Sequence, residues 1–422
     1  MPRGFHLLIA AQFLSALADN ALLIVMLAWL QAQGMAPWLA PLLKVGFIAA
    51  YVLLAPVVGP LADTWPKQRL MGWMNALKAA GAAALLWGLH PLLAFALVGL
   101  GAAAYAPAKY GLVTETVPAE RLVAANGWIE VTVVAAVLLG TGLGGALVST
   151  LWLQSATAQW LAQWGPGLPL AASVFVLLAL YAASAVLNRG IPGSGLRYPR
   201  TAWQPQVLLP AFWRDQRRLW RDHEGGLSLA ATSVFWGTGA TLQFMVLRWA
   251  QETLALPLSQ AALLQGVVAV GVVVGATAAG RWVPLSGARH LLWAGVLMGL
   301  ALPSILWVHS LAAAVPLLVA VGAVGGLMVV PLNALLQHRG AQLLSAGRSI
   351  AVQGFNENAS VLLALGAYSA TVAGGWPLAW VLVGLGGGLA AVLTLLARRA
   401  ARPAPAAAAV ASPAAAQPRS AG

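Results

Sequence analysis

The chain has 422 residues, of which 60% are hydrophobic and 8% charged, with a formal net charge of +13, a mean hydropathy of +0.82 and no cysteine. Apolar stretches of about 18 or more residues recur from end to end, which excludes a set of soluble domains and predicts membrane-spanning helices. The stretches do not alternate every second residue, so a β-barrel is excluded, and the absence of cysteine excludes disulfides, thiolate chemistry and iron–sulfur clusters.

The predicted fold is therefore an all-α polytopic membrane protein of about twelve transmembrane helices. The first apolar stretch is too long for a signal peptide and lacks a cleavage-like flank, so we expect it to remain as the first helix. In chain order the helices are expected over 5–31, 41–62, 68–89, 91–112, 122–150, 169–188, 228–251, 258–284, 288–308, 312–336, 347–372 and 376–397.

The two halves of the chain resemble each other. "YAPAKYG…ANGWIEV" parallels "VVPLNAL…VQGFNEN", which pairs Pro107 with Pro331 and Glu130 with Glu357, and "LAWLQ" parallels "LRWAQ". With the charged stretch that follows the sixth helix, these matches predict a duplication into two six-helix bundles around a central path at the bilayer midplane.

Four parts are expected from this organisation. They are an N-terminal six-helix bundle over 1–188, a basic linker over 189–227, a C-terminal six-helix bundle over 228–397 and a disordered, Ala/Pro-rich tail over 398–422.

Lys and Arg fall on alternate loops, which accounts for the net charge without nucleic acid. The loops 32–40, 151–168, 309–311 and 373–377 contain neither residue. By the positive-inside rule, both termini, the linker and the tail are expected in the cytoplasm.

"GPLADTWPKQRL" lies in the short loop between the second and third helices, where Gly59, Asp63 and Arg69 resemble the loop signature of the major facilitator superfamily. The glycine allows close helix approach, and the carboxylate can accept hydrogen bonds from a neighbouring helix N-terminus and from the nearby base, which latches the cytoplasmic side shut. The match is partial because Pro66 and Gln68 replace two residues of the signature, and a plain solvated turn is the alternative.

Ionisable side chains inside the apolar stretches are the candidate substrate-binding residues. Such a charge costs ~2.5–3.5 kcal/mol on insertion scales, so it normally faces a partner or a wet cavity. Polar residues at helical spacing share one face with each charge: Gln12 and Ser15 with Asp19, Asn75 with Lys78, Asn126 with Glu130, and Gln353 and Ser360 with Glu357.

Each candidate also has a structural interpretation. Asp19 either handles substrate or gating, or it forms a purely structural pair, most simply with Lys78. Glu130 and Glu357 either line the path or brace helix contacts. The cations near helix ends, Lys44, Arg248 and Lys109, either snorkel to the headgroups or contact substrate or a gate.

The sequence contains no motif that indicates catalysis. No Gly-Lys pair is present for a nucleotide loop, the six histidines are scattered without metal-ligand spacing, and no His-x4-Asp acyltransferase box occurs. We therefore expect a protein that is not an enzyme, with no cofactor and no metal.

Several stretches together resemble the bacterial lysophospholipid transporters of the major facilitator superfamily: "AQFLSALADNALL", "AAAYAPAKYG", "FWGTGATL", "VVPLNALLQHRG" and "AVQGFNENAS". The resemblance implies movement of lysophospholipids, chiefly lysophosphatidylethanolamine, from the outer to the inner leaflet of the cytoplasmic membrane. There a partner acyltransferase/acyl-carrier-protein synthetase would reacylate them. Charged positions that match the family are Asp19, Lys78, Lys109, Glu130, Arg339 and Glu357, with Arg339 and Lys109 assigned to gating.

Two departures affect the expected phosphate contact. Gln243 stands where the family has an arginine, and Arg248 follows five residues later, about 140° round the helix and ~7.5 Å along it. His338 also replaces an acidic residue beside Arg339.

A lysophospholipid presents a phosphate, usually an ammonium, and one acyl chain. We expect Asp19 to hold the ammonium and Lys78 the phosphate, with Trp236 or Phe244 along the chain, in a monomer. Two alternatives stay open: a proton-coupled exporter of amphipathic drugs that titrates Asp19, Glu130 or Glu357, and a non-transporting scaffold that binds a lipid enzyme through 189–227.

Overall fold

The computed structural model describes residues 3–36, 39–165, 170–196, 198–199 and 202–402. Within these residues all regular secondary structure is helical, which confirms the all-α prediction. The predicted tail falls outside the described residues from 403 onward, and its first residues continue the last helix as far as Ala401.

Twelve segments of the described chain correspond to the predicted spans. They are α1 (Arg3–Ala32), α2 (Leu39–Leu53) with α3 (Ala55–Thr64), α4 (Lys67–Ala84), α5 (Pro91–Thr116), α6 (Leu122–Leu147), α9 (Ala171–Arg189), α11 (His223–Thr253), α12 (Leu258–Trp282), α13 (Leu292–Ala301) with the flanking turns Leu285–Leu291 and Leu302–Trp307, α14 (Leu311–Leu343), α15 (Ala346–Ala373) and α16 (Leu378–Ala401). Three shorter helices join them: α7 (Thr150–Leu153), α8 (Ala156–Ala162) and α10 (Pro205–Arg221).

The spans differ in how apolar they are. Eight helices in the described part of the chain are long and apolar enough to cross a membrane, and the pair of α2 and α3 makes a ninth. This pair bends by 64° at Leu54, where Pro56 at the start of α3 cannot donate a backbone hydrogen bond to the preceding turn. The other three spans, α4, α11 and α15, are more polar, and each of them contributes to the cavity described below.

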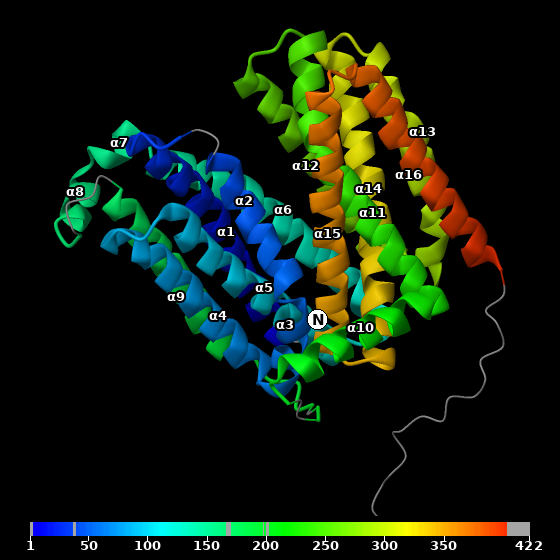
Figure 1. The fold of residues 1–422 in the computed structure, drawn as a ribbon, viewed down its shortest axis with the longest axis horizontal. Coiled ribbons are helices and arrows are strands. Elements are labelled where there is room, and N and C mark those ends of the chain that lie inside the picture. The colour runs from blue at the N-terminus through cyan, green and yellow to red at the C-terminus, as the bar shows by residue number, and fades with distance from the viewer. Residues whose placement is uncertain (1–2, 37–38, 166–169, 197, 200–201, 403–422) are drawn as a thin grey trace, which may run out of the picture.

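The helices form two bundles of six spans (Figure 1). In Figure 1 the bundles converge near α10 and splay apart at the other end. We call these the α10 end and the opposite end. The N-terminus and the end of α16 both lie at the α10 end, as expected for an even number of crossings.

Apolar packing joins the bundles at the α10 end. Leu112, Val123 and Ile129 of the first bundle share one buried cluster with Ala279 and Val330 of the second. Each bundle also has buried clusters of its own nearer the opposite end. The joint between the bundles is therefore confined to one end, which leaves the other end open.

Glycine brings the two bundles into backbone contact. A Cβ atom at Gly59 would lie 2.9 Å from Cα of Arg348, and one at Gly127 would lie 2.8 Å from the carbonyl oxygen of Ala276. Any larger residue at these positions would push the bundles apart. Asn126 and Gln337 add two side-chain hydrogen bonds across the same joint, at 2.9 and 2.8 Å.

Asp63 contacts the N-terminus of a neighbouring helix at the α10 end, the contact that the loop signature predicts. Its Oδ1 accepts a hydrogen bond from the backbone N–H of Gly347 at 3.0 Å, in the first turn of α15, and the hydroxyl of Ser345 donates to Oδ2. The positive end of the α15 dipole favours the carboxylate there. Arg69 is not the base of this contact, because its exposed side chain lines a surface groove with Arg189 instead.

Helix α10 makes part of the 189–227 segment a strap across the α10 end. Gln216 and Asn356 of α15 exchange two amide hydrogen bonds at 2.9 and 3.0 Å, and Phe212 packs edge-on against Phe355. The basic linker therefore contains a helix that packs on the second bundle. The division into four parts stays a prediction.

Asp222 fixes the start of α11 and the position of Arg339. Its Oδ1 accepts from the backbone N–H of Gly225 at 2.8 Å, and Arg339 donates to Oδ2 at 2.7 Å. Burial alone would raise the pKa of Asp222, but these hydrogen bonds hold it below its usual range. Arg339 thus braces α14 against the start of α11 within one bundle.

We predict that Asp63→Asn loosens the α10 end. A hydrogen bond to a charged group contributes about 1.5–3 kcal/mol, so its loss should raise the population of states open at this end by about tenfold. A cysteine introduced at Ala279, which is fully buried in the cluster between the bundles, would report this as faster maleimide labelling.

The cysteine-free chain makes the labelling site unique. Glu120→Gln is the matched control, because Glu120 is an exposed carboxylate near the same end. Equal labelling rates in the Asp63 variant and this control would contradict the role of the Asp63 contact.

Candidate functional site

A cavity of about 380 Å³ lies between the two bundles. Its wall comes from α1, α2, α3, α4, α5 and α6 on one side and from α11, α14 and α15 on the other. Lys44, in the first turns of α2 near the opposite end, belongs to the wall and is exposed. The cavity therefore extends toward the opposite end, while the α10 end is closed beneath it.

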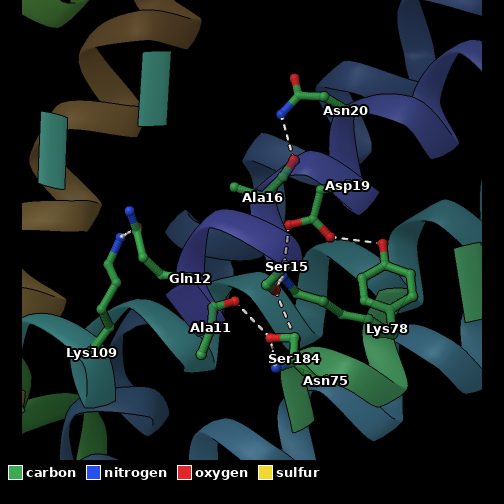
Figure 2. A network of polar contacts seen from close by, with 11 residues as sticks. Ala11, Gln12, Ser15, Ala16, Asp19, Asn20, Asn75, Lys78, Lys109 and Ser184 are labelled. Carbon is green, nitrogen blue, oxygen red and sulfur yellow. Dashed lines mark hydrogen bonds and ion pairs between the residues drawn. The ribbon is translucent and has the colours of Figure 1, made fainter. Parts of the chain in front are cut away.

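An ion pair between Asp19 and Lys78 forms one wall of the cavity (Figure 2). Lys78 Nζ lies 2.6 Å from Asp19 Oδ2, and the Lys78 side chain is only 2% exposed. The hydroxyl of Tyr181 on α9 donates to Asp19 Oδ1 at 2.8 Å. Both carboxylate oxygens of Asp19 are thus engaged from inside the protein, which is the pairing that the sequence left open as the structural interpretation.

The network continues behind this pair and joins three helices. Ser15 accepts from Lys78 at 3.0 Å and donates to Asn75 at 2.7 Å, and Asn75 donates to Ser184 at 2.8 Å (Figure 2). Ser184 donates onward to the carbonyl oxygen of Ala11. Asn75 is fully buried, so it supports the wall from behind and does not line the cavity.

Lys109 lines the cavity from α5. Its Nζ donates to Gln12 Oε1 at 3.2 Å and lies 4.1 Å from the ring centroid of Tyr110, and Gln12 in turn donates to Thr132 on α6. Lys109 is buried, so it does not snorkel to the headgroups. Its ammonium has no carboxylate within ion-pair distance in the described residues, although Glu130 attracts it at longer range.

The second bundle contributes amides and one carboxylate. Gln353 donates to Glu357 Oε1 at 2.8 Å and to Asn333 at 3.0 Å, and all three residues line the cavity. The predicted polar face of this helix is confirmed for Gln353 and Glu357. Ser360 instead lies against Gly237 of α11.

Apolar and aromatic side chains cover the rest of the wall. Phe47 stacks on Phe95 with ring centroids 5.3 Å apart, and Trp236 and Ile350 face them from the second bundle. The expected aromatic contact at Trp236 is thus present in the cavity. Phe244 is not part of it, because its ring is 42% exposed and stacks on Tyr368.

Four of the expected substrate-binding residues do not line the cavity, and two of them, Gln243 and Arg248, lie on α11. Gln243 is exposed and exchanges hydrogen bonds with Gln265, and Arg248 forms an ion pair with Glu252 at 2.6 Å, one turn along the same helix. Neither belongs to the cavity wall. In this structure neither residue is placed to contact a solute in the cavity, and whether Arg248 has taken over a phosphate contact stays a prediction to be tested.

The remaining predicted site residues lie away from the cavity wall. Glu130 is buried on α6 and does not line the cavity. Asp63, Gly59 and Arg339 lie at the α10 end, as described above, and their assignment to gating stays a prediction.

Sequence reasoning missed the tyrosines. Tyr181 holds Asp19, and Tyr51, Tyr105 and Tyr110 line the cavity. Tyr105 lies with its ring centroid 5.2 Å from Lys78 Nζ. The available signal was a hydroxyl in the middle of an apolar run, as in "LLALYAAS", but spacing alone does not show which helix it faces.

The wall suits an amphipathic solute. Two buried ammonium groups, two carboxylates and several amides form a polar patch in a cavity whose remaining wall is apolar and aromatic. In the described residues no group of three His, Cys, Asp or Glu side chains is placed to hold a metal ion. The arrangement can bind an anionic group beside an apolar chain.

A family model of the Major Facilitator Superfamily matches residues 8–356. The lysophospholipid transporter LplT of Enterobacter sp. (strain 638) is 40% identical to this chain over 393 residues, which cover 93% of this chain and 94% of that protein. The protein of the same name from Yersinia enterocolitica is 42% identical over 378 residues, or 89% of each chain.

Solved structures share the fold. FucP, a transporter of the same superfamily in its outward conformation, superposes with a TM-score of 0.70 at 18% identity, over 94% of this chain and 99% of that chain. The human organic anion transporter MFSD10 (TETRAN) gives a TM-score of 0.73 at 15% identity, over 94% and 100%.

We predict that Asp19 and Lys78 stabilise the protein only as a pair. Asp19→Asn leaves a buried ammonium without its counter-ion, so the free energy of unfolding should fall by about 3–5 kcal/mol. Asp19→Asn combined with Lys78→Met should recover most of this loss, because no buried charge remains. Chemical unfolding in detergent micelles measures both.

Removing one member of an exposed pair is the matched control. Glu252→Gln, which removes the exposed carboxylate that pairs with the half-buried Arg248, should cost less than about 1 kcal/mol. Additive losses in the Asp19/Lys78 double variant would contradict the coupling.

Proposed function

Because the chain belongs to the major facilitator superfamily and, within it, to the lysophospholipid transporters, we propose that it carries lysophosphatidylethanolamine from the outer to the inner leaflet of the bacterial inner membrane. The observation that carries the proposal is the cavity, in which buried cations lie beside an apolar wall between two bundles that join at one end only. The protein is a transporter, and no catalytic step is assigned to it.

We assign the headgroup contacts to the charged side chains of the cavity wall that do not already form an ion pair within the protein. Asp19 is engaged by both Lys78 and Tyr181, so we assign it to holding Lys78 in place rather than to the ammonium. Lys109 has no carboxylate at ion-pair distance and would bind the phosphate, with Lys78 close by in the same wall. Glu357 is the carboxylate that would receive the ammonium from the second bundle.

The acyl chain fits the remaining wall. Phe47, Phe95, Trp236 and Ile350 provide apolar surface next to the polar patch. Burying a chain there recovers about 25 cal/mol for each Å² of apolar surface, so the single chain contributes most of the affinity while the headgroup contacts fix its orientation. This division of labour matches a lipid with one acyl chain.

The direction of transport is supported by the loop charges together with the closed end. The basic loops support a cytoplasmic location for the α10 end and both termini, and the cavity would then extend toward the outer leaflet in this conformation. Release of the Asp63 contact would then open the path inward. Delivery to the inner leaflet would supply a partner acyltransferase/acyl-carrier-protein synthetase, and the transporter would act as a monomer.

Uptake of labelled lysophosphatidylethanolamine into vesicles that contain only this protein tests the function. Lys109→Met keeps the length of the side chain and removes the charge, so we expect uptake to fall at least about tenfold, equivalent to about 1.4 kcal/mol. Arg121→Gln, at an exposed position outside the cavity, should transport normally.

Wild-type vesicles without uptake would overturn the function. Normal uptake by Lys109→Met would overturn only its role as the phosphate contact. Export of amphipathic drugs that depends on a pH gradient, without lysolipid uptake, would favour the proton-coupled alternative.

We predict that Arg248 has no part in substrate binding. Arg248→Ala removes an ion pair that lies outside the cavity, so lysolipid affinity should change by less than about twofold. Gln243→Arg should likewise leave affinity unchanged. A gain of affinity in Gln243→Arg, measured in the same detergent, would show instead that α11 reaches the substrate in another conformation.

A further inference from the structure

A second, separate groove lies on the flank of the first bundle, between the start of α4 and the end of α9. It has a volume of about 500 Å³ and shares no residue with the central cavity. In Figure 1 these two helices lie on the side of the first bundle that faces away from the second. The groove therefore faces the surroundings of the protein rather than the transport path.

Small residues make the floor of this groove. Gly72 and Ala76 lie one turn apart on α4, on the same face as Arg69, and they face Ala185 of α9. A Cβ atom at Gly72 would have its nearest neighbour, the carbonyl oxygen of Ala185, at 3.8 Å. The groove thus has room for an apolar chain that runs along α4 from the helix start toward the middle of the membrane.

Two arginines lie at the end of the groove nearest the α10 end, where α4 begins and α9 ends. Arg69 and Arg189 are both exposed, and no carboxylate lines the groove. Neither arginine has an ion pair or a side-chain hydrogen bond within the described residues. The contrast is Lys67 on the same helix turn, which pairs with Glu115 at 2.7 Å.

Because of its position in the helix, an unpaired Arg69 is electrostatically unfavourable. The first turn of α4 contains no acidic residue, so Arg69 lies unpaired at the positive end of the helix dipole. An anion bound there would be stabilised by two guanidinium groups and by the dipole at once. Trp73, 62% exposed at the groove wall, has the amphipathic ring that prefers the headgroup level of a bilayer.

We propose that this groove binds one anionic diacyl phospholipid from the leaflet at the α10 end. The phosphodiester lies between Arg69 and Arg189, one acyl chain covers Gly72 and Ala76, and Trp73 packs beside the glycerol. Basic pockets between membrane helices select anionic headgroups in this way. The lipid is a resident ligand that joins α4 to α9, distinct from any transported lipid.

Native mass spectrometry of the full chain in detergent tests the proposal, with phosphatidylglycerol and phosphatidylethanolamine as probes. Arg69→Gln combined with Arg189→Gln should weaken phosphatidylglycerol binding by about tenfold or more. Gly72→Leu fills the floor and leaves both charges, and it should weaken binding similarly. Arg281→Gln combined with Arg289→Gln, which removes two exposed arginines outside the groove, is the matched control and should bind as the wild type does.

Equal phosphatidylglycerol affinity in the groove variants and the control would overturn the site, since attraction to the basic surface would then be general. Equal affinity of the wild type for both lipids would overturn the selection of an anionic headgroup. Inorganic phosphate should not displace the lipid, and displacement would identify a free anion as the ligand. If the double arginine variant fails to fold, Gly72→Leu still decides whether a chain occupies the groove. All these readouts are independent of transport.

Discussion

The buried ammonium of Lys78 is the constraint on which the first bundle depends. A charge that is 2% exposed inside an apolar bundle needs a counter-ion at close range, and Asp19 supplies it at 2.6 Å. Tyr181 completes the coordination of Asp19, so one side chain fixes the relative positions of α1, α4 and α9. Ser15, Asn75 and their neighbours extend the same network, which makes this bundle a rigid body with a polar wall.

The interactions that join the two bundles are weaker than the ion-pair network inside the first bundle. The joint consists of glycine contacts, aliphatic packing, an amide pair and the carboxylate of Asp63 at the very end. Separating these groups leaves no buried charge unpaired, because Asp63 would meet water as soon as the end opened. The strong interactions therefore lie within a bundle and the separable ones between bundles, which is the distribution that a rocking motion requires.

The sequence predicted what depends on position along a helix. The spans, the polar faces of α1 and α15 and a hydrogen bond from a neighbouring helix N-terminus to Asp63 all follow from spacing and from loop chemistry, whereas the structure identifies that helix as α15. It could not predict what depends on the rotation of one helix against another. Tyr181 was missed for this reason, and the surroundings of Arg248 were left open.

The length and flexibility of a side chain also limited how well its surroundings could be predicted from the sequence. Lys109 lies near a helix end, where a flexible ammonium could equally turn to the headgroups or to the interior. Only the packing of α1 and α6 around it, through Gln12 and Thr132, directs the ammonium to the interior.

The three polar spans also bear on how the chain is inserted into the membrane during synthesis. α4 is among the helices least able to leave the translocon for lipid alone, and it packs mainly on α5 and α9, which are synthesised after it. Its partner carboxylate, however, is in α1. The order of synthesis thus places the acid in the membrane before the base, so the nascent Lys78 can be neutralised as soon as it enters.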